Sequence, residues 1–175
     1  TQAAQAAGSP VAELRTQFAT AVELQSAGKF DEAEAAYKAI LEKAPDVPEV
    51  YQNLGSVLGQ KKDVAGAEAA YLKGLELKPD SADIATQLAK LYQDNGQPEK
   101  AMAVMAKSAG SNPADAKAQF NQGIFLLNAQ KNEEAIAAFE AAIKADPAMT
   151  EAYYRLGALM VGQGKIPEAI AHLEK

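Results

Sequence analysis

A fixed repeat length is the feature that most constrains how this chain can fold. Proline recurs every 34 residues, at Pro45, Pro79, Pro113 and Pro147. An alanine series keeps the same step, and a large apolar residue follows each alanine by four positions. The alanines are Ala33, Ala67, Ala101, Ala135 and Ala169, and the apolar residues are Tyr37, Tyr71, Met105, Phe139 and Leu173. Self-similarity at such a period is typical of proteins in which each repeat packs only on its neighbours.

The order of residue types inside one period resembles the tetratricopeptide repeat (TPR) family. The second repeat reads Tyr51-x-x-Leu54-Gly55-x-x-Leu58, then Ala67-x-x-x-Tyr71, then Pro79. The resemblance covers about Leu14 to Lys175, almost the whole chain. It implies an all-α fold: a right-handed α-solenoid of antiparallel helix pairs, with five repeats of which the last is incomplete. It also implies a non-catalytic adaptor that binds another protein or peptide in the concave groove lined by the first helix of each repeat.

The repeats divide the chain as follows. Residues 10–175 are expected to form the solenoid, with repeats at about 14–47, 48–81, 82–115, 116–149 and 150–175. Residues 1–9 form a low-complexity segment before it. The expected helices span 10–27, 31–43, 48–60, 64–78, 82–94, 98–110, 116–128, 132–145, 150–162 and 166–175. Each periodic proline ends a second helix, because proline disfavours helical geometry in the residue before it.

The turn inside each helix pair calls for a residue that tolerates positive φ. Gly28, Gly96 and Gly164 follow three of the first helices, where a left-handed residue commonly ends a helix. Lys62 and Gln130 occupy the same place in the other two repeats. If the backbone there has positive φ, each of these two residues costs on the order of 1 kcal/mol.

Two repeats depart from the pattern. In the first, Gln17, Thr20 and Ala21 stand where an aromatic residue, a leucine and a glycine are usual. In the fourth, Gln119 and Gln122 take the aromatic and leucine positions. We expect these departures to weaken local packing without changing the phase of the repeat.

A second stripe on each first helix points away from the core. In the second repeat Gln52, Ser56 and Gly59 are spaced by four and three, about 130–150° away from the packing stripe. The resemblance implies that this stripe lines the groove. Its middle is polar, whereas its C-terminal end is apolar, which is typical of an interaction surface. The predicted contact residues are Asn53, Gln87, Lys90, Asn121 and Arg155 for polar contacts, and Phe120, Ile124, Leu127 and Tyr154 as apolar anchors.

The amides in this stripe admit two interpretations. Asn53, Gln87 and Asn121 fall in one column, and each amide offers both a donor and an acceptor to a peptide backbone. In several peptide-binding members of the family, Asn in this column has that role. The alternative is that they are ordinary solvated polar residues.

A further comparison concerns the family's clamp for a C-terminal carboxylate. Lys90, Asn121 and Arg155 match part of it, but Thr86 and Glu151 stand where it needs lysines. Glu151 would repel a carboxylate. We therefore predict no intact clamp, and keep the narrower hypothesis that Arg155 with Asn121 pairs one acidic group of a partner.

Composition excludes several function classes. The net charge is -6, and nucleic-acid binders need clustered basic residues, so no nucleic-acid partner is predicted. The chain has no Cys and a single His, His172, which argues against a metal site and against catalysis by a triad. No phosphate-binding loop is visible, and no window approaches the ~20 apolar residues of a membrane span. We predict no enzyme, no cofactor and no membrane insertion, and leave the compartment open between cytoplasmic and, if a signal peptide once preceded Thr1, periplasmic or secreted.

The C-terminal repeat suggests an alternative function. The chain ends inside the last expected helix, so the face formed by Ile166, Ala169, Ile170 and Leu173 should be partly exposed. Such a face could stack on another molecule, with Thr1–Gly8 docking in a neighbouring groove. The alternative is therefore a self-associating scaffold, a homo-oligomer that assembles through its terminal repeat faces.

Overall fold

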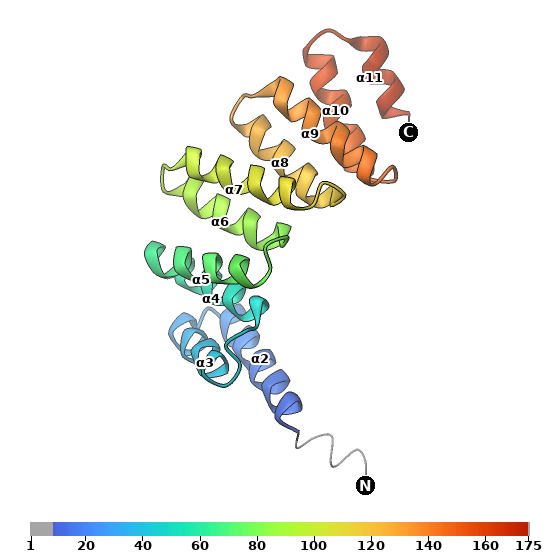
Figure 1. Ribbon diagram of the computed structural model, residues 1–175. Coiled ribbons are helices and arrows are strands. Elements are labelled where there is room, and N and C mark those ends of the chain that lie inside the picture. The colour runs from blue at the N-terminus through green and yellow to red at the C-terminus, as the bar shows by residue number, and fades with distance from the viewer. Residues whose placement is uncertain (1–8, 175) are drawn as a thin grey trace. The chain divides into compact units, whose positions relative to one another are not determined.

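A computed structural model describes residues 9–174, and within them every regular element is an α-helix. The helices, labelled in Figure 1, are α2 (Pro10–Ser26), α3 (Phe30–Lys43), α4 (Pro48–Gln60), α5 (Val64–Leu77), α6 (Ala82–Asp94), α7 (Pro98–Ser111), α8 (Ala116–Asn128), α9 (Asn132–Ala145), α10 (Thr150–Gly162) and α11 (Ile166–Leu173). The all-α helical-repeat fold is thus confirmed, and the expected helix boundaries agree within about two residues. The segment Thr1–Gly8 lies outside the described residues.

The helices form two compact units. Unit 1 is Thr1–Pro79 and contains α2 to α5, whereas unit 2 is Asp80–Lys175 and contains α6 to α11. Within each unit, consecutive helices pair through short turns, and successive pairs stack on one another. The first unit ends at Pro79, two residues before the expected end of the second repeat.

Small residues let the helices of each pair approach closely. The five periodic alanines, Ala33, Ala67, Ala101, Ala135 and Ala169, are all buried. A Cβ added to Gly55 would lie 2.7 Å from the Tyr71 ring, and one added to Gly123 would lie 2.6 Å from the Phe139 ring. Because glycine has no side chain, it leaves room at these positions for the large periodic residue of the partner helix.

All five predicted turn positions have positive φ. The angles are 74° at Gly28, 70° at Gly96, 76° at Gly164, 66° at Lys62 and 60° at Gln130. The repeat geometry thus imposes the same backbone conformation on residues with a Cβ, because the turn must redirect the chain in the same way in every pair.

One expectation about packing is wrong in detail. Gln119 does not loosen the fourth repeat: its side chain is buried and its Nε2 donates to the carbonyl oxygen of Ala109 at 2.9 Å. This bond satisfies a carbonyl in the last turn of α7, where no further helical N–H is available. The expected α11 face is partly exposed: Ile170 and Leu173 are each 49% exposed, whereas Ala169 is buried in the core cluster with Leu156 and Met160 of α10.

None of the described helices combines the length and the apolar character that a membrane span requires.

Candidate functional site

In unit 2 the first helices of three repeats lie side by side. The Lys117 ammonium on α8 lies 2.6 Å from a carboxylate oxygen of Asp83 on α6. Asn121 Nδ2, also on α8, donates to Thr86 Oγ1 on α6 at 2.9 Å. Leu127 on α8 and Arg155 on α10 line one pocket. We call this surface the first-helix face of unit 2 and define it by Thr86, Gln87, Lys90, Phe120, Asn121, Ile124, Leu127, Tyr154 and Arg155.

The amides of the predicted ladder do not have equivalent surroundings. Asn121 uses one N–H in its bond to Thr86, so its carbonyl oxygen and second N–H are left to contact a partner. Gln87 is half-buried, and its Oε1 has no hydrogen-bond partner among residues 9–174. Asn53 is half-buried in unit 1 and so is not part of this face.

The predicted apolar anchors divide into a base and a projecting residue. Phe120, Ile124 and Leu127 are half-buried and pack against the core cluster that includes Phe139. The rings of Phe120 and Phe139 are 5.5 Å apart at 51°. Tyr154 is 62% exposed, the highest value among the exposed large apolar side chains of the described residues. Phe120, Ile124 and Leu127 are thus held by the core of unit 2, whereas most of the Tyr154 side chain is open to solvent.

Lys90 and Arg155 differ in whether they have an acidic neighbour within the protein. Lys90 is exposed and lies 3.9 Å from an oxygen of Asp94, a separation at which an exposed pair contributes little. Arg155 is exposed and makes no hydrogen bond or ion pair with another residue in the range 9–174. It lines a pocket of ≈ 320 Å³ together with Leu127, Ala158 and Gln163. Arg155 is therefore a cation available to an acidic group beside an apolar surface.

In unit 1 the polar groove positions are bonded to one another. Tyr37 Oη donates to Gln25 Oε1 at 2.8 Å, and Gln25 Nε2 donates to Ser56 Oγ at 3.3 Å. These bonds connect α2, α3 and α4. Burial raises the pKa of Tyr37 to about 12 and that of Tyr71 to about 12, and a hydrogen bond with Ser56 opposes the shift at Tyr71. Gln25 and Ser56 therefore hold helices together here.

The repeat pattern places Ser56 in the groove stripe, and Gln25 in the corresponding stripe of the first repeat, but it does not reveal this pairing. The signal available was only that both are polar and stand 31 residues apart. Whether two such side chains meet depends on the spacing of the first helices, which the sequence does not contain. In addition, residues 9–174 bring together no group of three or more His, Asp or Glu side chains that could hold a metal ion.

Comparison with solved structures places the fold among TPR proteins. MamA residues 41-end from Desulfovibrio magneticus RS-1 match with a TM-score of 0.66 and 21% identity, over 92% of this chain and 91% of that one. YrrB, described as a TPR protein with an unusual peptide-binding site, matches with a TM-score of 0.60 and 24% identity, over 90% and 81%. PilF of Pseudomonas aeruginosa matches with a TM-score of 0.69 and 15% identity, over 91% and 72%. No match was found among curated proteins.

The family itself is shown by the sequence. The profile of the tetratricopeptide repeat matches residues 18–82, 86–149 and 122–175, which is most of the chain. This match agrees with the positive-φ turns, the buried alanines and the helix pairs described above. The chain belongs to the tetratricopeptide repeat family, whose general role is protein interaction.

Proposed function

We propose that this protein is a non-catalytic adaptor that binds a peptide segment of another protein on the first-helix face of unit 2. The observation that carries the proposal is Tyr154, an aromatic side chain 62% exposed next to the unpaired Arg155. Exposed aromatic and arginine residues are the types that most often dominate binding energy at protein interfaces. Arg155 would pair an acidic group, and the half-buried Phe120, Ile124 and Leu127 would support an apolar one.

The amide of Asn121 adds sequence-tolerant contacts to this proposal. Asn121 keeps a free carbonyl oxygen and one N–H, whereas the Oε1 of Gln87 is buried and so is not counted among the contacts. The free groups of Asn121 match the N–H and C=O of an extended backbone. The bond from Asn121 to Thr86 fixes the side chain in place, so less conformational entropy is lost when a peptide binds.

The test is a quantitative pull-down with a matched control. The first bait is the unmodified chain, the second carries Tyr154→Ala and Arg155→Gln, and the third carries Leu72→Ala and Lys107→Gln. The third removes an exposed apolar side chain and an exposed cation from other helices, with Leu72 47% exposed against 62% for Tyr154. A partner retained by the first and third baits and reduced at least several-fold on the second supports the face. Equal capture by all three contradicts it.

Self-association is a second candidate, favoured by the exposed apolar row on α11. Ile166, Ile170 and Leu173 are 47%, 49% and 49% exposed. The pairing to expect is between two α11 faces, as in a two-fold dimer, because like apolar rows then cover each other.

Sedimentation velocity over a concentration series tests this candidate. A dimer that Ile170→Lys converts to monomer supports assembly through α11. If the chain is monomeric at every concentration, self-association is contradicted and the peptide-binding proposal stands alone.

A further inference from the structure

The first helix of unit 1 is longer than the other first helices. Helix α2 has 17 residues, whereas α4, α6, α8 and α10 each have 13. The extra turn begins at Pro10 and is capped by Ser9, whose hydroxyl oxygen accepts from Ala12 N at 3.2 Å. This turn carries Val11, which is 59% exposed. A large apolar side chain thus stands on a turn that the other repeats lack.

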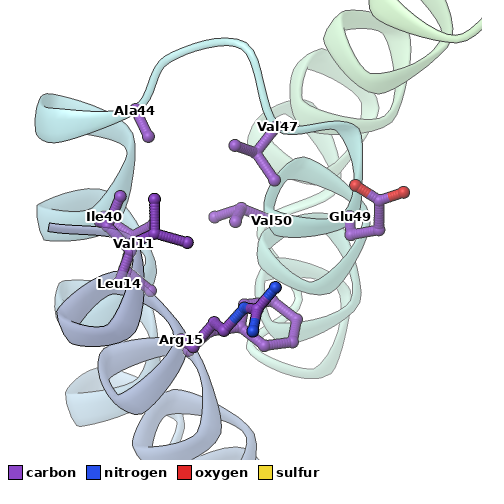
Figure 2. Close-up of a pocket in the computed structure, with 9 residues that line it drawn as sticks. Val11, Leu14, Arg15, Ile40, Ala44, Val47, Glu49 and Val50 are labelled. Carbon is purple, nitrogen blue, oxygen red and sulfur yellow. The ribbon is translucent and has the colours of Figure 1, made fainter. Parts of the chain in front are cut away.

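The extra turn builds one wall of a pocket, which we call the α2–α4 pocket. Val11, Leu14 and Phe18 line it from α2, Ile40 and Ala44 from α3 and its end, and Val47 and Val50 from the opposite side. Figure 2 shows Val11, Leu14, Ile40 and Ala44 along one side of the opening, and Val47 and Val50 across from them. The volume is ≈ 280 Å³, with almost entirely apolar lining. The shape and lining suit one bulky apolar side chain.

Arg15 gives the pocket a charge preference. In Figure 2 its side chain reaches from α2 towards α4 at one end of the opening. Among residues 9–174 it makes no hydrogen bond or ion pair. Glu13 lies on the same helix, but its carboxylate already pairs with the Lys43 ammonium at 3.1 Å. It also accepts a hydrogen bond from Gln17 at 3.0 Å. Arg15 therefore remains available to a carboxylate from outside.

The second charge at the pocket restricts where that carboxylate can lie. Glu49 belongs to the α4 wall, has no partner within the described residues, and would repel an acidic group placed near it. A bound acidic residue must therefore lie beside Arg15 and away from Glu49, and a neutral or basic residue can lie beside Glu49.

We propose that the α2–α4 pocket is a second binding site, which anchors one bulky apolar side chain of a partner peptide that carries an acidic residue directly beside it. The apolar side chain fills the space between Val11 and Val50, and the acidic residue pairs with Arg15. This site lies entirely in unit 1 and does not depend on the first-helix face of unit 2.

The probe is the blocked peptide Ac-Gly-Asp-Phe-Gly-NH2, titrated into the full chain labelled with ¹⁵N. Its two controls replace Asp with Asn, or Phe with Ala. The proposal requires amide shifts in the N-terminal half of α2, the α3–α4 turn and the start of α4. It also requires that the Ala peptide produces no saturable shifts, and that the Asn peptide binds about threefold more weakly, the range for an exposed charge pair.

Variants then separate this pocket from other sites. Val11→Gln should weaken the probe about fivefold, because the probe covers only part of the valine surface that the substitution replaces with an amide. Val22→Gln is the matched control, since Val22 is also an exposed valine on α2 but does not line the pocket. Arg15→Gln should abolish the preference for Asp over Asn. Tyr154→Ala with Arg155→Gln should leave the binding unchanged, so failure of the unit 2 proposal would not affect this one.

Five outcomes would overturn the proposal. Three concern the probe: no saturable shifts, shifts confined to unit 2, or equal weakening by Val11→Gln and Val22→Gln. The other two would assign the pocket to a different occupant. Tighter probe binding after deletion of residues 1–8 would assign it to the chain's own start, and a dimer that Val11→Gln dissociates in sedimentation velocity would assign it to a second copy.

Discussion

At the scale of single residues, close approach and backbone conformation set the sequence rules of the repeat. Phe139 is fully buried because Gly123 leaves room for its ring, and the same relation holds between Tyr71 and Gly55. Turn residues follow a different rule, because the repeat imposes positive φ even where the residue has a Cβ, as at Gln130. The fold thus contains both optimised and strained positions, and each gives a prediction.

Relieving the strained turn should stabilise the protein. Gln130 has φ 60°, is exposed, and its side chain has no packing role. Gln130→Gly removes the clash of Cβ in the left-handed region, and we expect a gain of about 0.5–1 kcal/mol in the free energy of unfolding. Urea unfolding followed by circular dichroism measures it. Gln130→Ala keeps the Cβ and should give no gain, so equal effects of Gly and Ala would contradict this reasoning.

Filling the space beside Phe139 should destabilise the protein. Gly123→Ala places a Cβ 2.6 Å from the Phe139 ring, and overpacking of this kind costs about 1–3 kcal/mol. Gly110→Ala is the control, because nothing lies within 4 Å of its added Cβ and alanine favours a helix by about 1 kcal/mol over glycine. Thermal unfolding should show opposite signs for the two variants. A stabilised Gly123→Ala would mean that the ring moves aside at no cost.

At the scale of elements, helix α8 connects the core of unit 2 to its proposed binding face. Gly123 and Phe120 of this helix both lie against Phe139 of α9, and Ile124 packs against the same core, while Asn121 bonds to Thr86 of α6. Its start depends on Asp115, whose carboxylate accepts from Lys117 N at 2.9 Å and from Ala118 N at 3.1 Å. A carboxylate there also interacts favourably with the positive end of the helix.

Removing this cap should affect stability more than the fold. Asp115→Ala should lower the free energy of unfolding by about 1 kcal/mol, the usual effect of losing such a cap. Asp115→Asn keeps an acceptor for the same N–H groups and should lose less. Hydrogen exchange at the first turn of α8 provides the local readout. Unchanged protection there in the Ala variant would show that the cap contributes nothing.

At the scale of the whole molecule, stability should depend on alkaline pH through two buried tyrosines. Burial raises the pKa of both Tyr37 and Tyr71 from 10.0 to about 12. Between these values the unfolded chain releases protons that the folded chain retains. The neutral hydroxyls therefore contribute stability that is fully present below about pH 10 and is lost as the pH rises towards about 12.

The measurement compares unfolding midpoints in urea at about pH 8 and about pH 11. The chain should lose more stability over this range than a Tyr37→Phe, Tyr71→Phe double variant, in which only the shared titration of other groups remains. Equal losses in the two proteins would show that these hydroxyls titrate alike in the folded and unfolded states.

The sequence by itself determines the repeat period and the local backbone features that depend on it. The spacing of prolines, alanines and glycines predicts the helix boundaries, the buried alanines and the positive φ at Gln130, because each depends on residues near in the chain. Only the tertiary structure decides how side chains on different repeats meet. Asn121 bonds to Thr86, Gln119 to a carbonyl of α7, and Val11 closes a pocket against Val50. These relations depend on distances between helices and on side-chain rotamers, and a one-dimensional period contains neither.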